Sequence, residues 1–252
     1  MATRTGIRAA NTAFVPQTRH SCRKHGLRAA TARHFPRLEV SVPRILVESD
    51  PQQWRDLYPL FIGFLNPRPI ALVSTVSPAG VTNLAPYSFY NMVSSQPPVV
   101  IFGPGNHPDG AAKDTLRNIE ATGEFVIATV VAGIARQAVA CASELAPESS
   151  EFAWSGLTPA PALRVAAPLV QESPVNMECT VREILHFGSG PGAGNAVLGD
   201  VRVLHVAPEI LDARSRVDPT KLPTVGRLGG KWYCTVQQPY EIEIPKPGGK
   251  AR

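Results

Sequence analysis

The chain has 252 residues, 44% of them hydrophobic and 18% charged, which is enough apolar material for one substantial core and too little charge for a disordered chain. Its net charge of +5 comes from the N-terminal segment, because residues 1–38 hold eight Lys and Arg and no acid, while the rest holds 17 basic and 20 acidic residues. The rest therefore lacks the basic balance of a nucleic-acid-binding domain. No apolar run reaches the ~18–20 residues that a membrane helix needs, so neither nucleic acid nor membrane is expected as a partner.

The first 42 residues are rich in Arg, Ala, Thr and His and lack a sustained apolar period, so residues 1–42 are predicted to be a disordered basic arm. The arm is either an organelle transit peptide, which its Arg-rich and acid-free composition favours, or the product of a start codon assigned too far upstream. Residues 43–247 are predicted to form the folded domain. Because a secretory apolar segment is lacking, we expect a cytoplasmic protein, or a mitochondrial one if the arm is a transit peptide.

A short helix is predicted to open at Asp50-Pro51, and strands follow it. Residues 69–76 are apolar and β-branched, which predicts a buried strand. Residues 81–90 continue as a second strand, in which Pro86 indicates a sheet edge, a bulge or a ligand-lining kink. A further strand is predicted at residues 99–102.

The middle of the chain predicts two helices around a strand. Residues 113–122 have a helical pattern that Gly123 can end. Residues 125–130 are predicted to form a strand, and the alanine-rich residues 133–145 a helix. The proline-rich residues 146–168 are interpreted as a connection.

Two long strands are predicted at residues 175–187 and 196–206, with the glycine-rich residues 188–194 as the tip of a hairpin. The chain thus predicts at least six strands and two or three helices. The strands do not alternate with crossover helices, so a doubly wound parallel sheet is not expected. A mainly β fold with a closed or partly closed antiparallel barrel fits better.

The tripeptide Lys113-Asp114-Thr115 stands at the start of a predicted helix, where free N–H groups and the positive end of the dipole favour an anion. Lys113 would add a charge and Thr115 a hydrogen bond, a combination suited to a phosphate. Asp114 or Thr115 can also cap the helix. The alternative is an ordinary cap beside a solvated lysine.

The segment from Asn83 to Asn91 mixes strand character with closely spaced polar side chains. A planar heterocycle such as a flavin needs apolar walls and a few donors and acceptors, which this segment can supply. The alternative is an amphipathic edge strand.

The glycine-rich segment 226–233 can let the backbone approach a planar ligand closely. Arg227 can meet a phosphate or a nicotinamide dinucleotide. The alternative is a tight turn before a strand.

Motifs of other reaction classes are lacking. There is no GxSxG, HExxH or P-loop, and residues 187–195 (FGSGPGAGN) do not have the G-x-G-x-x-G spacing of a nucleotide loop. The four cysteines form no CxxC pair, so no metal site is predicted.

Taken in this order, these pieces resemble the flavin reductase-like family of FMN-binding split β-barrels, over roughly residues 45–245. The resemblance implies a mainly β fold with a few helices, a split antiparallel β-barrel, and a homodimer with the flavin near the subunit interface. The matching stretches are residues 68–76, 83–91, 94–98, 113–119, 151–158, 172–179 and 225–233.

The resemblance also implies FMN-contacting positions: a strand pair with its kink, a phosphate-binding helix start, two positions beside the flavin or its ribityl chain, and a late segment that closes over the site. These positions are Ser74, Thr75, Asn83, Ala85, Pro86, Tyr87, Ser88, Asn91, Ser94, Lys113, Asp114, Thr115, Arg227, Gly229, Gly230 and Tyr233.

The function that the resemblance implies is an enzyme in which NADH or NADPH reduces FMN, and the reduced flavin serves a partner monooxygenase. No catalytic side chain is predicted, because hydride transfer between a nicotinamide and a flavin needs alignment and not a protein nucleophile. Two alternatives are an FMN electron carrier without nicotinamide activity and a non-catalytic ligand-binding barrel.

Overall fold

The computed structural model describes residues 46–47, 54–146 and 148–244, so the arm predicted at residues 1–42 lies outside the described residues. The chain divides into two compact units, Met1–Leu57 and Tyr58–Arg252. The second unit holds the sheets and the cavities, and the description below concerns it. The helix predicted to open at Asp50-Pro51 is described from Trp54 onward, as α1 (Trp54–Phe64).

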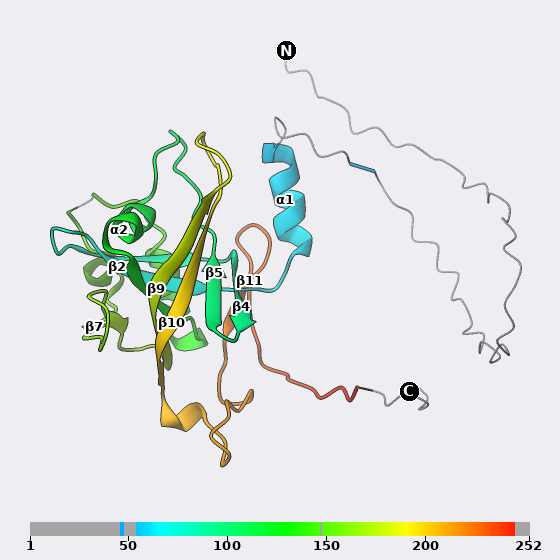
Figure 1. The fold of residues 1–252 in the computed structure, drawn as a ribbon. Coiled ribbons are helices and arrows are strands. Elements are labelled where there is room, and N and C mark those ends of the chain that lie inside the picture. Colours follow the sequence, from blue (N-terminus) through cyan, green and yellow to red (C-terminus); the bar gives the residue numbers. More distant parts are fainter. Residues whose placement is uncertain (1–45, 48–53, 147, 245–252) are drawn as a thin grey trace, which may run out of the picture. The chain divides into compact units, whose positions relative to one another are not determined.

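A seven-stranded antiparallel sheet, in the order β3-β2-β6-β9-β10-β5-β4, forms the centre of this unit (Figure 1). The two longest strands, β9 and β10, form the predicted hairpin and run side by side. The strands are β2 (Ala71–Val76), β3 (Thr82–Tyr87), β4 (Tyr90–Ser95), β5 (Pro98–Phe102), β6 (Glu124–Thr129), β9 (Val175–His186) and β10 (Asn195–Val206).

The two edges of this sheet, β3 and β4, follow each other in the chain and are joined only by Ser88 and Phe89. This corrects the prediction of one strand over residues 81–90, which the structure divides between opposite edges. The sequence pattern does not reveal this break between the strands, because the link contains no glycine. Since consecutive strands occupy opposite edges, the sheet must curl, as in a barrel.

Smaller elements surround the sheet. The helix predicted over residues 133–145 is shorter than expected, and the connection predicted over residues 146–168 holds a helix and a strand. These elements are β1 (Arg68–Pro69), α2 (Asp114–Thr122), a 3₁₀ turn η2 (Ala132–Ile134), α3 (Ala135–Ala140), α4 (Glu151–Ser155), β7 (Pro159–Ala160), β8 (Leu169–Val170), a 3₁₀ turn η3 (Pro208–Ile210), β11 (Val225–Arg227) and β12 (Tyr233–Thr235).

The alternating side chains of β2 enter two different cores. Val73 packs in a cluster with Leu116 of α2, while Leu72 packs in a second cluster with residues of α3 and α4. Both β2 side chains are fully buried, and burial of such a side chain contributes about 1.5–3 kcal/mol. β2 is therefore fixed between the two helical layers, and its neighbour β3 is fixed with it.

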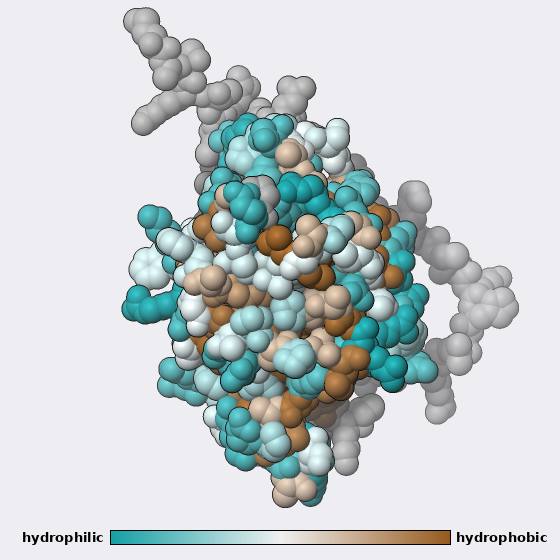
Figure 2. Space-filling model, turned by 90° about the vertical axis from the view of Figure 1, so that its left-hand side faces the viewer, coloured by the Kyte–Doolittle hydropathy of each residue, from teal (hydrophilic) through white to brown (hydrophobic). Residues whose placement is uncertain are grey.

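None of the helices in the described ranges is long and apolar enough to cross a membrane. On the face that Figure 2 shows, hydrophilic side chains interrupt the hydrophobic ones. No continuous apolar surface covers the described residues on that face.

Candidate functional site

A cavity of about 570 Å³, here called the main cavity, lies between β3 and the start of α2. Asn83, Pro86 and Tyr87 line it from β3, and Lys113 and Thr115 line it from the other side. The two segments on which the sequence prediction depends therefore border the same cavity. Its volume lies within the range of small-molecule and cofactor sites.

A buried polar network fixes the start of α2 against the sheet. The side-chain amide of Asn83 donates to the hydroxyl oxygens of Thr75, at 3.1 Å, and Thr115, at 2.9 Å. The amide of Asn118 donates to the same Thr75 oxygen at 3.0 Å. Thr75, Asn83 and Thr115 thus hold one another and determine where the helix begins.

The start of α2 differs from the predicted cap. Lys113 is the N-cap residue and no side chain caps the helix, because Asp114 is already its first residue and pairs with Arg117. Arg117 also donates to the carbonyl oxygen of Ala112 at 2.8 Å. Two cations, Lys113 and Arg117, therefore lie at the positive end of the helix dipole and line the main cavity.

The hydroxyl of Tyr87 is buried and has no hydrogen-bond partner among the described residues. Burial raises the pKa of this hydroxyl, and the nearby Thr115 side chain offsets only part of the rise. An unpaired buried hydroxyl costs about 1–3 kcal/mol. Because Tyr87 lines the main cavity, a polar ligand atom there would remove this cost. The donor set thus fits FMN: Lys113 and the uncapped N–H groups of the helix start suit a phosphate, and an unpaired hydroxyl beside Ala85 and Pro86 suits the ring.

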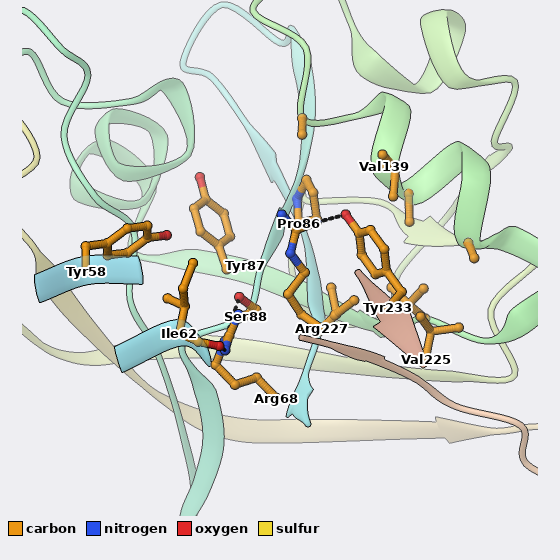
Figure 3. Close-up of a pocket in the computed structure, with 15 residues that line it drawn as sticks. Tyr58, Ile62, Arg68, Pro86, Tyr87, Ser88, Val139, Val225, Arg227 and Tyr233 are labelled. Carbon is orange, nitrogen blue, oxygen red and sulfur yellow. Dashed lines mark hydrogen bonds between the residues drawn. The ribbon is translucent and has the colours of Figure 1, made fainter. Parts of the chain in front are cut away.

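A second cavity, here called the small cavity, encloses about 210 Å³ and shares Pro86, Tyr87 and Ala142 with the main cavity. Figure 3 shows Arg227 and Tyr233 directed toward Pro86, and Tyr58 facing Tyr87 across the space. Because the two cavities share lining residues, they adjoin.

Ten of the sixteen predicted contact residues line one or both cavities. Asn91 and Ser94 line neither, because the break after Tyr87 places them on β4 at the other edge of the sheet. Ser74 and Thr75 are fully buried and line neither cavity. The hydroxyl of Ser74, like that of Tyr87, lacks a partner among the described residues.

The structure gives a conformational reason for glycine at positions 229 and 230 that does not involve a planar ligand. A Cβ at Gly229 would lie 3.2 Å from the Cα of Gly63, so Gly229 allows a close approach to α1. Gly230 has a φ of 58°, which glycine adopts without strain. Neither lines a cavity, and both have a conformational role in the turn, while their contact with a flavin stays a prediction.

Sequence reasoning missed Glu151, a buried carboxylate that lines the main cavity from α4. Its Oε2 accepts a hydrogen bond from the backbone N–H of Leu84 at 2.9 Å. Because β3 is an edge strand, no neighbouring strand pairs with this N–H. Burial raises the pKa of this carboxyl group, and the N–H of Leu84 opposes the rise. The sequence feature that could have indicated this helix is Ser150, because serine is a common N-cap residue and Ser150 caps α4. In the structure the Ser150 hydroxyl also forms a 2.7 Å hydrogen bond with the hydroxyl of Thr82 in β3.

Cys141 also lines the main cavity, and the sequence pattern did not place it there. Burial raises its pKa to about 11, so the thiolate is not available near neutral pH. The thiol is therefore part of the cavity wall and not a nucleophile.

Comparison with known proteins gives the same assignment as the site. Residues 64–221 match the description "Flavin reductase like domain". An uncharacterised protein of Aquifex aeolicus is 36% identical over 177 residues, which are 70% of this chain and 88% of that protein.

Two solved structures share the fold. Nitrilotriacetate monooxygenase component B from Bacillus cereus is 30% identical, with a TM-score of 0.73 over 79% of this chain and all of that one. A flavin reductase-type protein with a split barrel domain from Shewanella frigidimarina is 23% identical, with a TM-score of 0.66 over 77% of this chain and 93% of that one. The predicted split β-barrel is confirmed, and flavin-related oxidoreductase chemistry is supported. The chain belongs to the flavin reductase-like family.

Proposed function

We propose that this protein is an NAD(P)H-dependent flavin reductase that binds FMN in the main cavity. The observation that carries the proposal is that the segment Asn83–Tyr87 of β3, here called the bend, and the start of α2 border the same cavity. A phosphate and a planar ring can be held at the same time only if these two segments adjoin.

The start of α2 supports phosphate binding. Lys113 supplies positive charge, and no side chain caps the N–H groups of the first turn, while Arg117 also lines the cavity but is paired with Asp114. Lys113 forms no ion pair among the described residues, so its ammonium group is available to a ligand. Charge-assisted hydrogen bonds of this kind are about twice as strong as neutral ones.

The bend supports ring binding. Pro86 has no N–H, lies on an edge strand and lines both cavities beside Tyr87. Tyr87 offers a buried hydroxyl, and Pro86 and Ala85 offer apolar surface. When bound, FMN would accept a hydride from NADH or NADPH and pass on the electrons. The protein's part is to orient the ring and exclude water, so no side chain needs to act as a nucleophile.

The similarity to a monooxygenase component B supports a flavin-consuming partner monooxygenase. The reduced flavin would then leave or be handed on to that partner. A protein that keeps FMN tightly and never transfers it would instead be the electron carrier considered above.

The proposal includes a homodimer. All described residues of α1 are at least partly exposed, including Leu60, Phe61 and Phe64, whose side chains are 51%, 45% and 65% exposed. The edge strand β4 also exposes Met92, at 60%, and Val93, at 53%. Large apolar side chains gathered on a helix and a sheet edge are typical of an interface, and a second copy of the chain is the proposed partner.

The visible spectrum tests the function directly. The purified full-length protein is mixed with FMN, freed of excess by gel filtration, and recorded before and after NADH or NADPH without air. Loss of the visible absorption band of the flavin at a catalytic rate supports the reductase. A yellow protein that neither nucleotide bleaches supports the electron carrier, and a colourless protein that does not quench flavin fluorescence supports the non-catalytic barrel.

A further inference from the structure

Two guanidinium groups, Arg68 and Arg227, line the small cavity without a carboxylate beside them. Neither forms an ion pair in the described part of the chain, and no Asp or Glu lines this cavity. Arg68 is 9% exposed. A cation that is desolvated without a counter-ion is costly, so this pair creates a demand for negative charge.

Arg68 cannot itself take a ligand in a bidentate manner, because neutral oxygens already occupy most of its donors. It donates to the carbonyl oxygens of Ile62, at 2.8 Å, Leu65, at 2.6 Å, and Leu228, at 3.0 Å, and to Ser88 Oγ at 3.4 Å. These hydrogen bonds hold the guanidinium group in place, but because their acceptors are neutral they do not neutralise its positive charge. Burial lowers the pKa of Arg68, and the positive charge of Arg227 lowers it further. Arg68 therefore contributes positive electrostatic potential to the small cavity and does not itself bind the ligand.

Arg227 has donors to spare. It donates to the hydroxyl oxygen of Tyr233 and to the carbonyl oxygen of Gly230, at 2.6 Å. A guanidinium has five N–H donors, so about three stay free. Because Tyr233 accepts from Arg227, its own hydroxyl hydrogen is free to donate. Figure 3 shows both polar ends pointing toward Pro86, the residue that the two cavities share.

The rest of the small cavity combines aliphatic side chains with the hydroxyl-bearing Tyr58, Tyr87 and Ser88. Ile70, Val130, Val139 and Val225 supply aliphatic walls. A volume of about 210 Å³ admits one ring with a small substituent, and is below the range of about 300–1,000 Å³ for drug-sized ligands. A whole nicotinamide dinucleotide does not fit in it.

We propose that the small cavity is an anion-selective subsite for a small organic carboxylate with one planar ring, contacted by Arg227 and Tyr233. This inference deepens the proposed function, since it names the class of second substrate that would lie beside the bound flavin. Aliphatic walls hold the ring, and the free donors of Arg227 pair with both carboxylate oxygens.

The test uses 4-fluorobenzoate and its neutral counterpart 4-fluorobenzamide, titrated against the full-length protein by ¹⁹F NMR, with and without FMN. We expect the carboxylate to bind about 10- to 100-fold more tightly than the amide, the range of a hydrogen bond to a charged group. Equal affinities, or displacement of 4-fluorobenzoate by an equal concentration of inorganic phosphate, would overturn the inference.

The variants separate charge from shape. R227Q should lower the affinity for 4-fluorobenzoate to that for the amide, R227K should restore part of it, and the exposed control R214Q should leave it unchanged. If R227Q does not fold, the carboxylate-to-amide ratio of the unaltered protein and the R227K variant still decide the question. Unchanged carboxylate affinity in a folded R227Q contradicts the assignment.

Quenching of FMN fluorescence is measured in the same samples. FMN binding without preference for the carboxylate overturns this inference and leaves the proposed function in place. Selective carboxylate binding by a protein that does not bind FMN supports the subsite and overturns the proposed function.

Discussion

Single residues around the main cavity divide into those that hold the fold and those that are free to meet a ligand. Asn83 and Thr115 are committed to each other, whereas Lys113 and the Tyr87 hydroxyl are not committed to any described side chain. Sequence patterns identify residue types at a helix start or in a strand. They do not show which polar groups are already paired, because pairing depends on contacts between distant segments.

Replacing Lys113 with alanine tests the phosphate site. We expect K113A to weaken FMN binding by about 1–3 kcal/mol, because a charge-assisted hydrogen bond is lost. The dissociation constant is measured by quenching of flavin fluorescence. K221A, which removes a lysine outside both cavities, serves as the control. Equal affinity of K113A and the unaltered protein would remove Lys113 from the site.

Glu151 predicts a dependence of stability on pH. Its pKa is raised above the usual 4.5 in the folded state, so the folded protein binds more protons than the unfolded chain just above that pH. The carboxyl group therefore supports folding most at low pH and loses this contribution as the pH rises through the folded-state pKa.

E151Q removes this titration while keeping an acceptor for the N–H of Leu84. We expect its melting temperature to exceed that of the unaltered protein at pH 8, by about 2–4 °C for each kcal/mol of relieved desolvation, and the difference to vanish near pH 4. Melting curves over this pH range measure it. The exposed E183Q is the control, and a difference that does not change with pH would exclude the buried carboxyl group as its cause.

At the level of elements, the position of α2 depends on polar side chains as well as on its apolar face. Leu116 and Ile119 bury that face, but the hydroxyl of Thr115 joins the helix start to β3. The sequence predicted this helix and its end at Gly123, which has the expected left-handed φ of 73°. It did not predict α4, because a helix of five residues within a proline-rich stretch is too short to show a recognisable helical periodicity.

Thr115→Val tests the network. The isosteric change removes the acceptor for the Asn83 amide and leaves that donor buried, which should destabilise the protein by about 1–3 kcal/mol and also weaken FMN binding. Urea unfolding and FMN titration measure the two effects. Thr122→Val in the same helix changes a hydroxyl that bonds only backbone carbonyls. Equal stability of the two variants would argue against the network.

For the whole molecule, the family and the mainly β barrel could be predicted because buried strands such as residues 69–76 have a clear apolar pattern and the motifs occur in a specific order. The division of residues 81–90 between two sheet edges could not, because alternation continues through Ser88 and Phe89. The position of Asn91 and Ser94 on β4, outside both cavities, could not be predicted for the same reason, since both follow the break. The small cavity was missed because α1, α3 and β11 form it together.

The proposed homodimer gives a prediction at this scale. Phe64→Ser on α1 should convert a dimer into a monomer, because a large exposed apolar side chain is removed from the proposed interface. Light scattering after size-exclusion chromatography measures the mass. W154S, which removes a side chain that is 60% exposed on α4, should leave the mass unchanged. A monomeric unaltered protein would contradict the homodimer.

The two-residue link between β3 and β4 has a consequence for how this protein tolerates change. Ser88 lines the small cavity, and with Phe89 it also connects the first and last strands of the sheet order. An insertion in this link would therefore change both the distance between the two edge strands of the barrel and the shape of the small cavity. The hairpin tip at residues 188–194 lines neither cavity, so insertions there should be far less damaging.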